Sequence, residues 1–170
     1  VDAGCEHIQV DEPLFARQVN DALSFGFEGI DRCFHKVPNS VKRIVHMCCG
    51  YPDKLDAINY PKAPLDSYKK ISKQLDSSIL DAISIEDAHR YNDEEIFEDF
   101  KNKKLILGLI KIASSKEETE QEIEQRIKVV LRYIDKERLI AAPDCGLGFL
   151  SRELAIKKLT TMVNAARKFI

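Results

Sequence analysis

The sequence predicts an α/β fold built on a parallel β-sheet, and two observations carry this prediction. First, five short runs of β-branched or apolar residues recur along the chain, and a polar or helical stretch follows each one, which is the pattern of successive βα units. Second, runs such as residues 105–110 do not alternate polar with apolar side chains, as is typical of parallel strands buried on both faces. No repeat, low-complexity segment or Gly/Ser linker interrupts the 170 residues, so we treat the chain as one structural unit.

The five predicted strands can be placed along the chain by these runs. They cover residues 7–10, 41–45, 80–85, 105–112 and 138–142. Residues 50–62, directly after the second strand, contain Pro52, Asp53, Asn59 and Pro61 without helical periodicity, so we expect a long loop there. Loops that follow the strands of parallel βα folds carry the active site.

Two helices are predicted near the C-terminus, because apolar residues recur there at a spacing of three or four. The first helix would bury Ile123, Ile127, Val130, Leu131 and Ile134, and the second Ala155, Leu159, Met162, Val163, Ala166 and Ile170. Ser115 and Glu118 are spaced as a capping box for the first helix. On the second helix, we expect Lys157, Lys158, Arg167 and Lys168 on the surface.

Composition excludes several classes of protein. Lys plus Arg is 26 and Asp plus Glu is 28, for a net charge of −2, and no stretch concentrates positive charge as a nucleic-acid surface requires. The apolar runs are far shorter than the roughly 20 residues that span a bilayer, and the N-terminus lacks a signal sequence. Five cysteines, two of them adjacent, suit metal ligation or free thiols better than disulfides. We therefore expect a soluble, cytoplasmic protein.

The clearest chemical signal is His46-Met47-Cys48, at the end of the second predicted strand. Side chains two residues apart on a strand point to the same side, so both could reach one ion. Cys145 and Glu86 follow two other predicted strands, and strand ends converge in this architecture. Thiolate, imidazole and carboxylate suit zinc better than Mg²⁺ or Ca²⁺. The alternative, that these cysteines only pack in the core, stays open.

Four short motifs, in this order, resemble successive motifs of the C-terminal domain of cobalamin-independent methionine synthase. They are Ile8-Gln9-Val10-Asp11-Glu12-Pro13, His46-Met47-Cys48, Ser84-Ile85-Glu86 and Pro143-Asp144-Cys145-Gly146-Leu147. The resemblance implies a (β/α)₈ TIM barrel, of which residues 1–170 would be the C-terminal part with five or so βα units. It implies Zn²⁺ as cofactor and His46, Cys48, Glu86 and Cys145 as its four ligands. It also implies that Asp11 holds the amino group of an amino-acid thiol.

The activity that this resemblance implies is methyl transfer from a methyltetrahydropteroyl donor to a homocysteine-like thiol, in methionine biosynthesis. Zinc would deprotonate the thiol and so make the nucleophile. Glu86, the hardest of the four ligands, would be the one displaced when the substrate sulfur binds. The resemblance assigns no further catalytic residue.

The sequence departs from this family at one strand end, where the family has an Asp-Ile-His-type motif whose His assists proton delivery to the folate. Residues 108–114 read Gly-Leu-Ile-Lys-Ile-Ala-Ser, so Ala113 stands where that His is expected. With Cys48-Cys49-Gly50-Tyr51-Pro52 before its long loop and residues 143–148 reading Pro-Asp-Cys-Gly-Leu-Gly, the sequence is similar to a divergent branch of the superfamily, which resembles the zinc-dependent epoxyalkane:coenzyme M transferases. The missing His favours as an alternative a zinc thiol alkyltransferase or lyase that acts on another electrophile such as an epoxide.

Length raises a third possibility. A (β/α)₈ barrel needs about 250 residues, and this sequence starts at Val1 rather than at a methionine. We therefore expect a fragment that lacks its N-terminal barrel portion. Such a fragment would need that portion or a partner chain to be stable and active. The alternative is a non-catalytic barrel fragment.

Several residues near the proposed ligands have two readings. We expect Cys49 to point away from the site and pack in the core. His89 and Arg90 could line the mouth of the site or be solvated, and Tyr51 and Tyr60 could form a substrate wall or pack within their loop. Asp144 could support the metal site or cap the following helix, and capping is the commoner role.

Overall fold

The computed structural model describes all residues from Val1 to Ile170 and contains one parallel five-stranded sheet. The strands lie in sequence order, β1-β2-β3-β4-β5, as expected for consecutive βα units. Their bounds are β1 His7–Asp11, β2 Lys42–Met47, β3 Ala82–Ile85, β4 Lys104–Ile110 and β5 Leu139–Pro143. All five predicted strands are confirmed, although β4 ends at Ile110, two residues before the predicted end.

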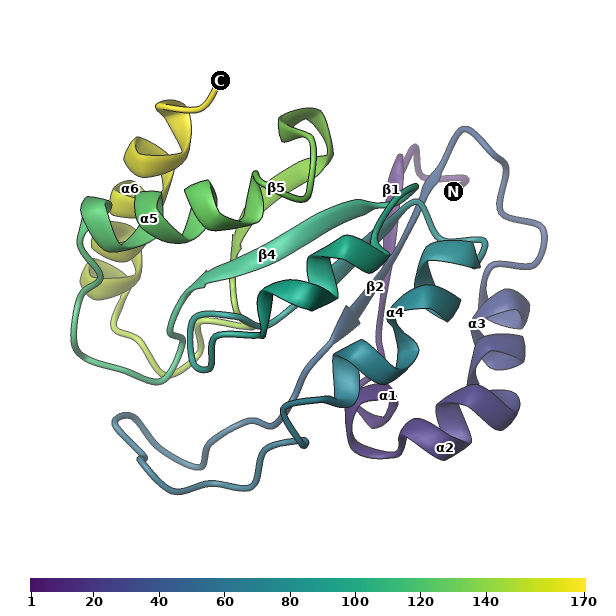
Figure 1. Ribbon diagram of the computed structural model, residues 1–170, viewed down its shortest axis with the longest axis horizontal. Helices are drawn as coiled ribbons and strands as arrows, with labels where there is room; N and C mark the ends of the chain where they lie inside the picture. Colours follow the sequence, from purple (N-terminus) through teal and green to yellow (C-terminus); the bar gives the residue numbers. More distant parts are fainter.

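Helices connect and cover the strands (Figure 1). Between β1 and β2 lie α1 Leu14–Arg17, α2 Val19–Asp21, the π-helical turn η1 Ala22–Gly26 and α3 Phe27–Cys33. The later elements are α4 Ser67–Ser77, the 3₁₀ helix η2 Glu94–Asp99, α5 Glu120–Val130, the 3₁₀ turn η3 Lys136–Arg138 and α6 Arg152–Arg167. None of the helices combines the length with the apolar composition that a membrane-spanning segment requires.

The two faces of the sheet differ in burial. Side chains alternate between the faces, and on one of them Val45, Met47, Ile83, Ile85, Leu105 and Leu107 are fully buried. These residues share one core cluster with Tyr68 and Ile71 of α4, Ile123 and Ile127 of α5, and Met162 of α6. On the opposite face, by the strand register, Gln9 and Asp11 are exposed and Ile140 is 40% exposed. The helices therefore cover one face and leave the other partly open.

The N-cap of helix α5 lies four residues after the predicted one. Its capping box is formed by Thr119 and Glu122, whose side chains each accept a hydrogen bond from the other residue's backbone N–H. The prediction of Ser115 and Glu118 was wrong because tertiary contacts take both residues. Glu118 accepts hydrogen bonds from Lys111 N and Lys158 Nζ, and Ser115 N donates to Asp56 Oδ1.

Helix α6 follows its predicted face with three corrections. Val163, expected in the core, is 39% exposed. Lys158, expected on the surface, is 1% exposed and forms an ion pair of 3.1 Å with Glu118. Ile170, expected in the core, lies beyond the helix and is 94% exposed. The apolar stem of a lysine can fill a core position when a carboxylate is available for its end, and apolar periodicity alone does not detect this.

Candidate functional site

Three of the four proposed metal ligands come together at the carboxyl ends of the strands. The ligand atoms of His46, Cys48 and Cys145 all lie within 4.8 Å of one another. His46 is on β2, Cys48 follows that strand directly and Cys145 follows β5. The structure therefore joins residues about 100 positions apart in the sequence, as the convergence of strand ends predicts.

The side chain of His46 is oriented as a metal ligand would be. Its Nδ1 lies 2.8 Å from Ser84 Oγ, and the residue is 6% exposed. Its Nε2 is buried and has no hydrogen-bond partner in the protein. A buried, unpaired polar atom costs free energy, and an ion held between Nε2 and the two thiols would provide the missing partner. The residues present therefore fit a soft divalent metal with nitrogen and sulfur ligands.

The two cysteines of this cluster interact with each other. A hydrogen bond with Cys145, together with burial, raises the pKa of Cys48 to about 12, and the same contact lowers the pKa of Cys145. Burial alone would lower the pKa of His46, but the neighbouring Cys48 raises it above its usual value. Metal binding would displace the thiol protons, because only the thiolate is a ligand.

Glu86 lies beside this cluster and is 2% exposed. Its Oε1 accepts a hydrogen bond of 2.8 Å from Cys49 N. Burial, and then the nearby Cys48, raise the pKa of Glu86 to about 7. Its carboxylate is not among the atoms within 4.8 Å of one another, so the structure brings Glu86 next to the site without placing it in the cluster. Cys49 itself is fully buried in the core, which confirms its expected packing.

Asp144 holds the loop that follows Glu86 and does not cap a helix. Its carboxylate is fully buried and accepts hydrogen bonds of 2.7–2.8 Å from the backbone N–H groups of Asp87, Ala88 and His89. Ser151 caps α6 in its place. The expectation that Asp144 caps the following helix was wrong. Its three hydrogen-bond donors lie more than 50 residues away in the sequence, so no local sequence pattern indicates this contact.

Space for Asp144 is provided by a glycine. A Cβ atom on Gly108 of β4 would collide with the carboxylate of Asp144. The register between β4 and β5 shifts at Gly108 and Ile110, which brings Asp144 in against β4. Burial raises the pKa of Asp144 to about 7.

Sequence reasoning also missed a buried ion pair between the loop that follows Glu86 and helix α5. The carboxylate of Asp87 is fully buried and accepts hydrogen bonds from Arg126 Nε at 2.5 Å and Nη2 at 2.7 Å. Arg126 Nη2 also donates to Asn92 O. Asp144 and Arg126 together fix the loop that follows Glu86, and an i,i+39 pair has no signature in the sequence.

Asp11, the proposed substrate-binding residue, is the last residue of β1 and is exposed. It is paired in register with His46, so both side chains lie on the partly open face of the sheet. Its Oδ1 accepts a hydrogen bond of 2.7 Å from Gln9 Nε2. An exposed carboxylate without a cationic partner is therefore present at the strand end next to the candidate metal ligands.

The long segment between β2 and α4 is an extended excursion, as predicted (Figure 1). Tyr51 donates a hydrogen bond to Gly146 O and stacks on Phe149, so it packs against the loop that carries Cys145. Arg90 donates to Ala63 O and Pro64 O and therefore holds the segment in place.

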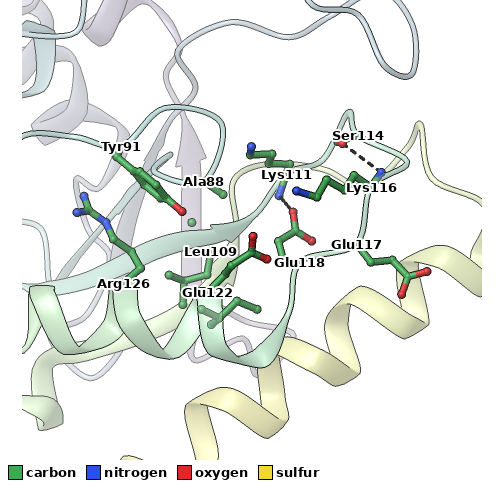
Figure 2. Close-up of a pocket in the computed structure, with 12 residues that line it drawn as sticks. Ala88, Tyr91, Leu109, Lys111, Ser114, Lys116, Glu117, Glu118, Glu122 and Arg126 are labelled. Atoms are coloured by element: carbon green, nitrogen blue, oxygen red, sulfur yellow. Dashed lines mark hydrogen bonds between the residues drawn. The ribbon is translucent and has the colours of Figure 1, made fainter.

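A pocket of about 60 Å³ lies between the β4–α5 loop and α5 (Figure 2). Figure 2 shows Lys111, Lys116 and Arg126 around it together with Glu117, Glu118 and Glu122. It contains none of the candidate metal ligands, and its opposite charges largely compensate one another.

Comparison with known proteins agrees with the resemblance. The model of the family described as cobalamin-independent synthase, catalytic domain, matches residues 1–168. A methionine synthase of Saccharolobus islandicus is 28% identical over 169 residues, which are 98% of this chain and 45% of the relative. A methionine synthase of Sulfurisphaera tokodaii is 26% identical over 168 residues. The chain thus spans less than half the length of these relatives.

Solved structures give the same result. A B12-independent methionine synthase from Shewanella sp. W3-18-1, in complex with selenomethionine, superposes with a TM-score of 0.86 and 25% identity over 99% of this chain and 49% of that one. A second structure, from Listeria monocytogenes, shares the fold with a TM-score of 0.71. The fold is therefore the predicted partial barrel, and the chain belongs to the cobalamin-independent synthase catalytic-domain family.

Proposed function

We propose that this chain is part of a zinc-dependent S-methyltransferase that transfers a methyl group from a methyltetrahydropteroyl donor to homocysteine or a similar thiol, in methionine biosynthesis. The observation that carries this proposal is the cluster of His46, Cys48 and Cys145 with its buried, unpaired Nε2 atom. Further support comes from the relatives named methionine synthase and from the selenomethionine bound to the Shewanella protein.

The proposed zinc ligands are His46, Cys48, Glu86 and Cys145. A zinc ion held there would keep a substrate thiol in its thiolate form at neutral pH. Ser84 would hold the His46 ring through Nδ1, so that Nε2 stays directed at the thiols. Asp144 and Arg126 would hold Glu86 in place through the loop that follows it.

Asp11 is the proposed anchor for the ammonium group of the amino-acid thiol. Its carboxylate is exposed at the end of the strand next to His46, and its only side-chain partner is Gln9. An ammonium group bound at Asp11 would direct the rest of a short amino acid towards the adjacent strand end, where the ligands lie.

We further propose that residues 1–170 form the C-terminal part of the catalytic domain. The partly open face of the sheet and the 45% coverage of the relatives support this assignment. The thiol site is built within these residues, because the ligands and Asp11 are all in this chain. Thiol binding can therefore be tested on the chain itself.

The test is the absorption spectrum of the chain loaded with Co²⁺ in place of zinc. Homocysteine should increase the sulfur-to-cobalt charge-transfer band, because a third thiolate joins those of Cys48 and Cys145. Asp11→Asn should require a higher homocysteine concentration and leave the band of the metal-loaded chain unchanged. A band that homocysteine does not alter would contradict the proposal. Two activity assays then identify the electrophile. Methyl transfer from a folate donor would identify the folate, and thiol-dependent loss of an epoxide would identify the epoxide.

A further inference from the structure

A cleft of about 390 Å³ lies at the same end of the sheet as the metal cluster, and the proposed function assigns it no role. Its walls come from three loops that follow successive strands: residues 56–62 after β2, His89 after β3 and residues 111–114 after β4. Three of its lining residues, Tyr60, Lys62 and His89, carry polar hydrogens without partners in the protein.

The ammonium group of Lys62 and the hydroxyl group of Tyr60 are both buried and make no hydrogen bond. Burial lowers the pKa of Lys62. Its Nζ lies 4.8 Å from the centre of the Tyr60 ring, a cation–π contact that compensates only part of the lost hydration. A buried cation without an anion is costly, so this arrangement is one that an entering anion would stabilise.

His89 provides a third donor. Its Nε2 accepts hydrogen bonds from the backbone N–H groups of Ile112 at 3.0 Å and Ala113 at 3.3 Å. Because Nε2 accepts, the proton of the neutral ring is on Nδ1. Burial lowers the pKa of His89 to about 4, so the ring is neutral at pH 7. The Nδ1 proton has no acceptor among the hydrogen bonds of the protein.

These three donors are neighbours, and each of the nearby carboxylates accepts hydrogen bonds from backbone N–H groups rather than from the three donors. The rings of Tyr60 and His89 meet edge to face with their centres 6.2 Å apart. Glu86 Oε1 accepts from Cys49 N, Asp144 accepts from three backbone N–H groups, and Asp56 Oδ1 accepts from Ser115 N. No carboxylate forms an ion pair with Lys62.

The cleft is held open by backbone contacts. Asp56 N donates to Ala113 O at 2.9 Å, and Ala63 N donates to Cys49 O at 2.7 Å. Gly50 has φ +152°, and a side chain there would collide with Pro61 O. The loop that carries Tyr60 and Lys62 is therefore fixed at one end against the segment that follows β4 and at the other against Cys49, the neighbour of Cys48.

We propose that this cleft binds an oxyanion, a carboxylate or phosphate group of the alkyl donor, with Lys62 as the recognising cation and Tyr60 and His89 as additional hydrogen-bond donors. The assignment to the donor rests on the proposed function, because Asp11 at β1 is there assigned to the thiol, whereas the cleft lies over the loops after β2, β3 and β4. The binding of an oxyanion does not depend on that assignment.

The test is a titration of the chain, with zinc and without metal, with inorganic phosphate and with glutarate. The side-chain ¹⁵N signals of His89 report binding in its immediate surroundings. We expect a saturable shift of the Nδ1 signal with at least one of the two anions. Saturation by phosphate alone identifies a phosphate site, and saturation by glutarate alone identifies a carboxylate site.

Lys62→Met should weaken this binding about tenfold or more, the effect of one lost hydrogen bond to a charged group. Lys54→Met is the matched control, because Lys54 is an exposed lysine of the same loop and lies outside the cleft. Tyr60→Phe removes only one hydroxyl group and should weaken binding less, and it keeps the test valid if Lys62→Met does not fold.

The proposal is wrong if neither anion shifts the His89 signals, or if Lys62→Met and Tyr60→Phe both bind as tightly as the unmodified chain. This failure is distinct from failure of the proposed function. A chain that binds homocysteine at its metal but no oxyanion would contradict only the role of the cleft, and a chain that binds an oxyanion without a metal–thiol interaction would contradict only the proposed function.

Discussion

The imidazole Nδ1 of His46 lies 2.8 Å from the hydroxyl oxygen of Ser84, on the neighbouring strand β3. This contact leaves Nε2 free for an ion and fixes the ring, because His46 can then donate its Nδ1 proton to Ser84. Ser84→Ala should lower zinc affinity about 10- to 100-fold with little loss of folding. Competition with a chromophoric chelator measures this change, and an unaltered affinity would show that the hydroxyl group does not orient the ring.

The pair formed by Asp87 and Arg126 should be the most costly ion pair to break. Asp87 is fully buried and the side chain of Arg126 is 11% exposed, so Arg126→Met leaves a buried carboxylate without its partner. We expect a loss of about 3–5 kcal/mol in the free energy of unfolding. The control is Arg132→Met, because Arg132 and Glu94 form an exposed pair worth at most about 1 kcal/mol. Urea denaturation measures the free energy of unfolding of both variants. Equal losses in the two variants would contradict this ranking.

Gly108 should tolerate no side chain. A methyl group there would collide with Asp144, so Gly108→Ala should destabilise the chain by about 1–3 kcal/mol and also weaken metal binding through the displaced loop. Gly29→Ala is the matched control. Gly29 lies in helix α3, and a Cβ atom there would have no other atom within 4 Å. Alanine forms helices better than glycine does. Thermal unfolding should move in opposite directions for the two variants.

His89 should make stability depend on pH. Burial lowers its pKa in the folded chain to about 4, below the usual 6.5, so the unfolded chain binds this proton more readily. The contribution to stability is complete above pH 6.5 and is lost as the pH falls towards 4. Glu86 and Asp144, whose pKa values are raised, act in the opposite direction. The measurement is therefore the difference in the free energy of unfolding between the unmodified chain and His89→Gln. This difference should decrease from pH 7 to pH 5. A difference that does not change with pH would contradict the predicted contribution of His89.

The parts of this molecule that follow local rules could be predicted from the sequence. Apolar runs located all five strands, and the convergence of strand ends placed Cys145 beside His46 and Cys48. Ser115 and Glu118 have the spacing of a capping box, but contacts with Asp56 and Lys158 engage both residues instead.

Contacts between distant loops could not be predicted in this way. Asp144 binds three backbone N–H groups more than 50 residues away, and His89 accepts from Ala113 across 24 residues. Such contacts depend on which loops meet above the sheet, and neither periodicity nor spacing encodes that. The cleft with Lys62 is of this kind, since its donors come from two different loops.

The measurement that tests the central claim most directly is the zinc content of the purified chain. We predict about one zinc ion per chain, as in other four-ligand sites, and its loss in both Cys48→Ser and Cys145→Ser. Cys33→Ser, at an exposed cysteine outside the site, should retain the metal. A folded chain that binds no zinc, or cysteine variants that keep it, would contradict the assignment of this cluster as a metal centre.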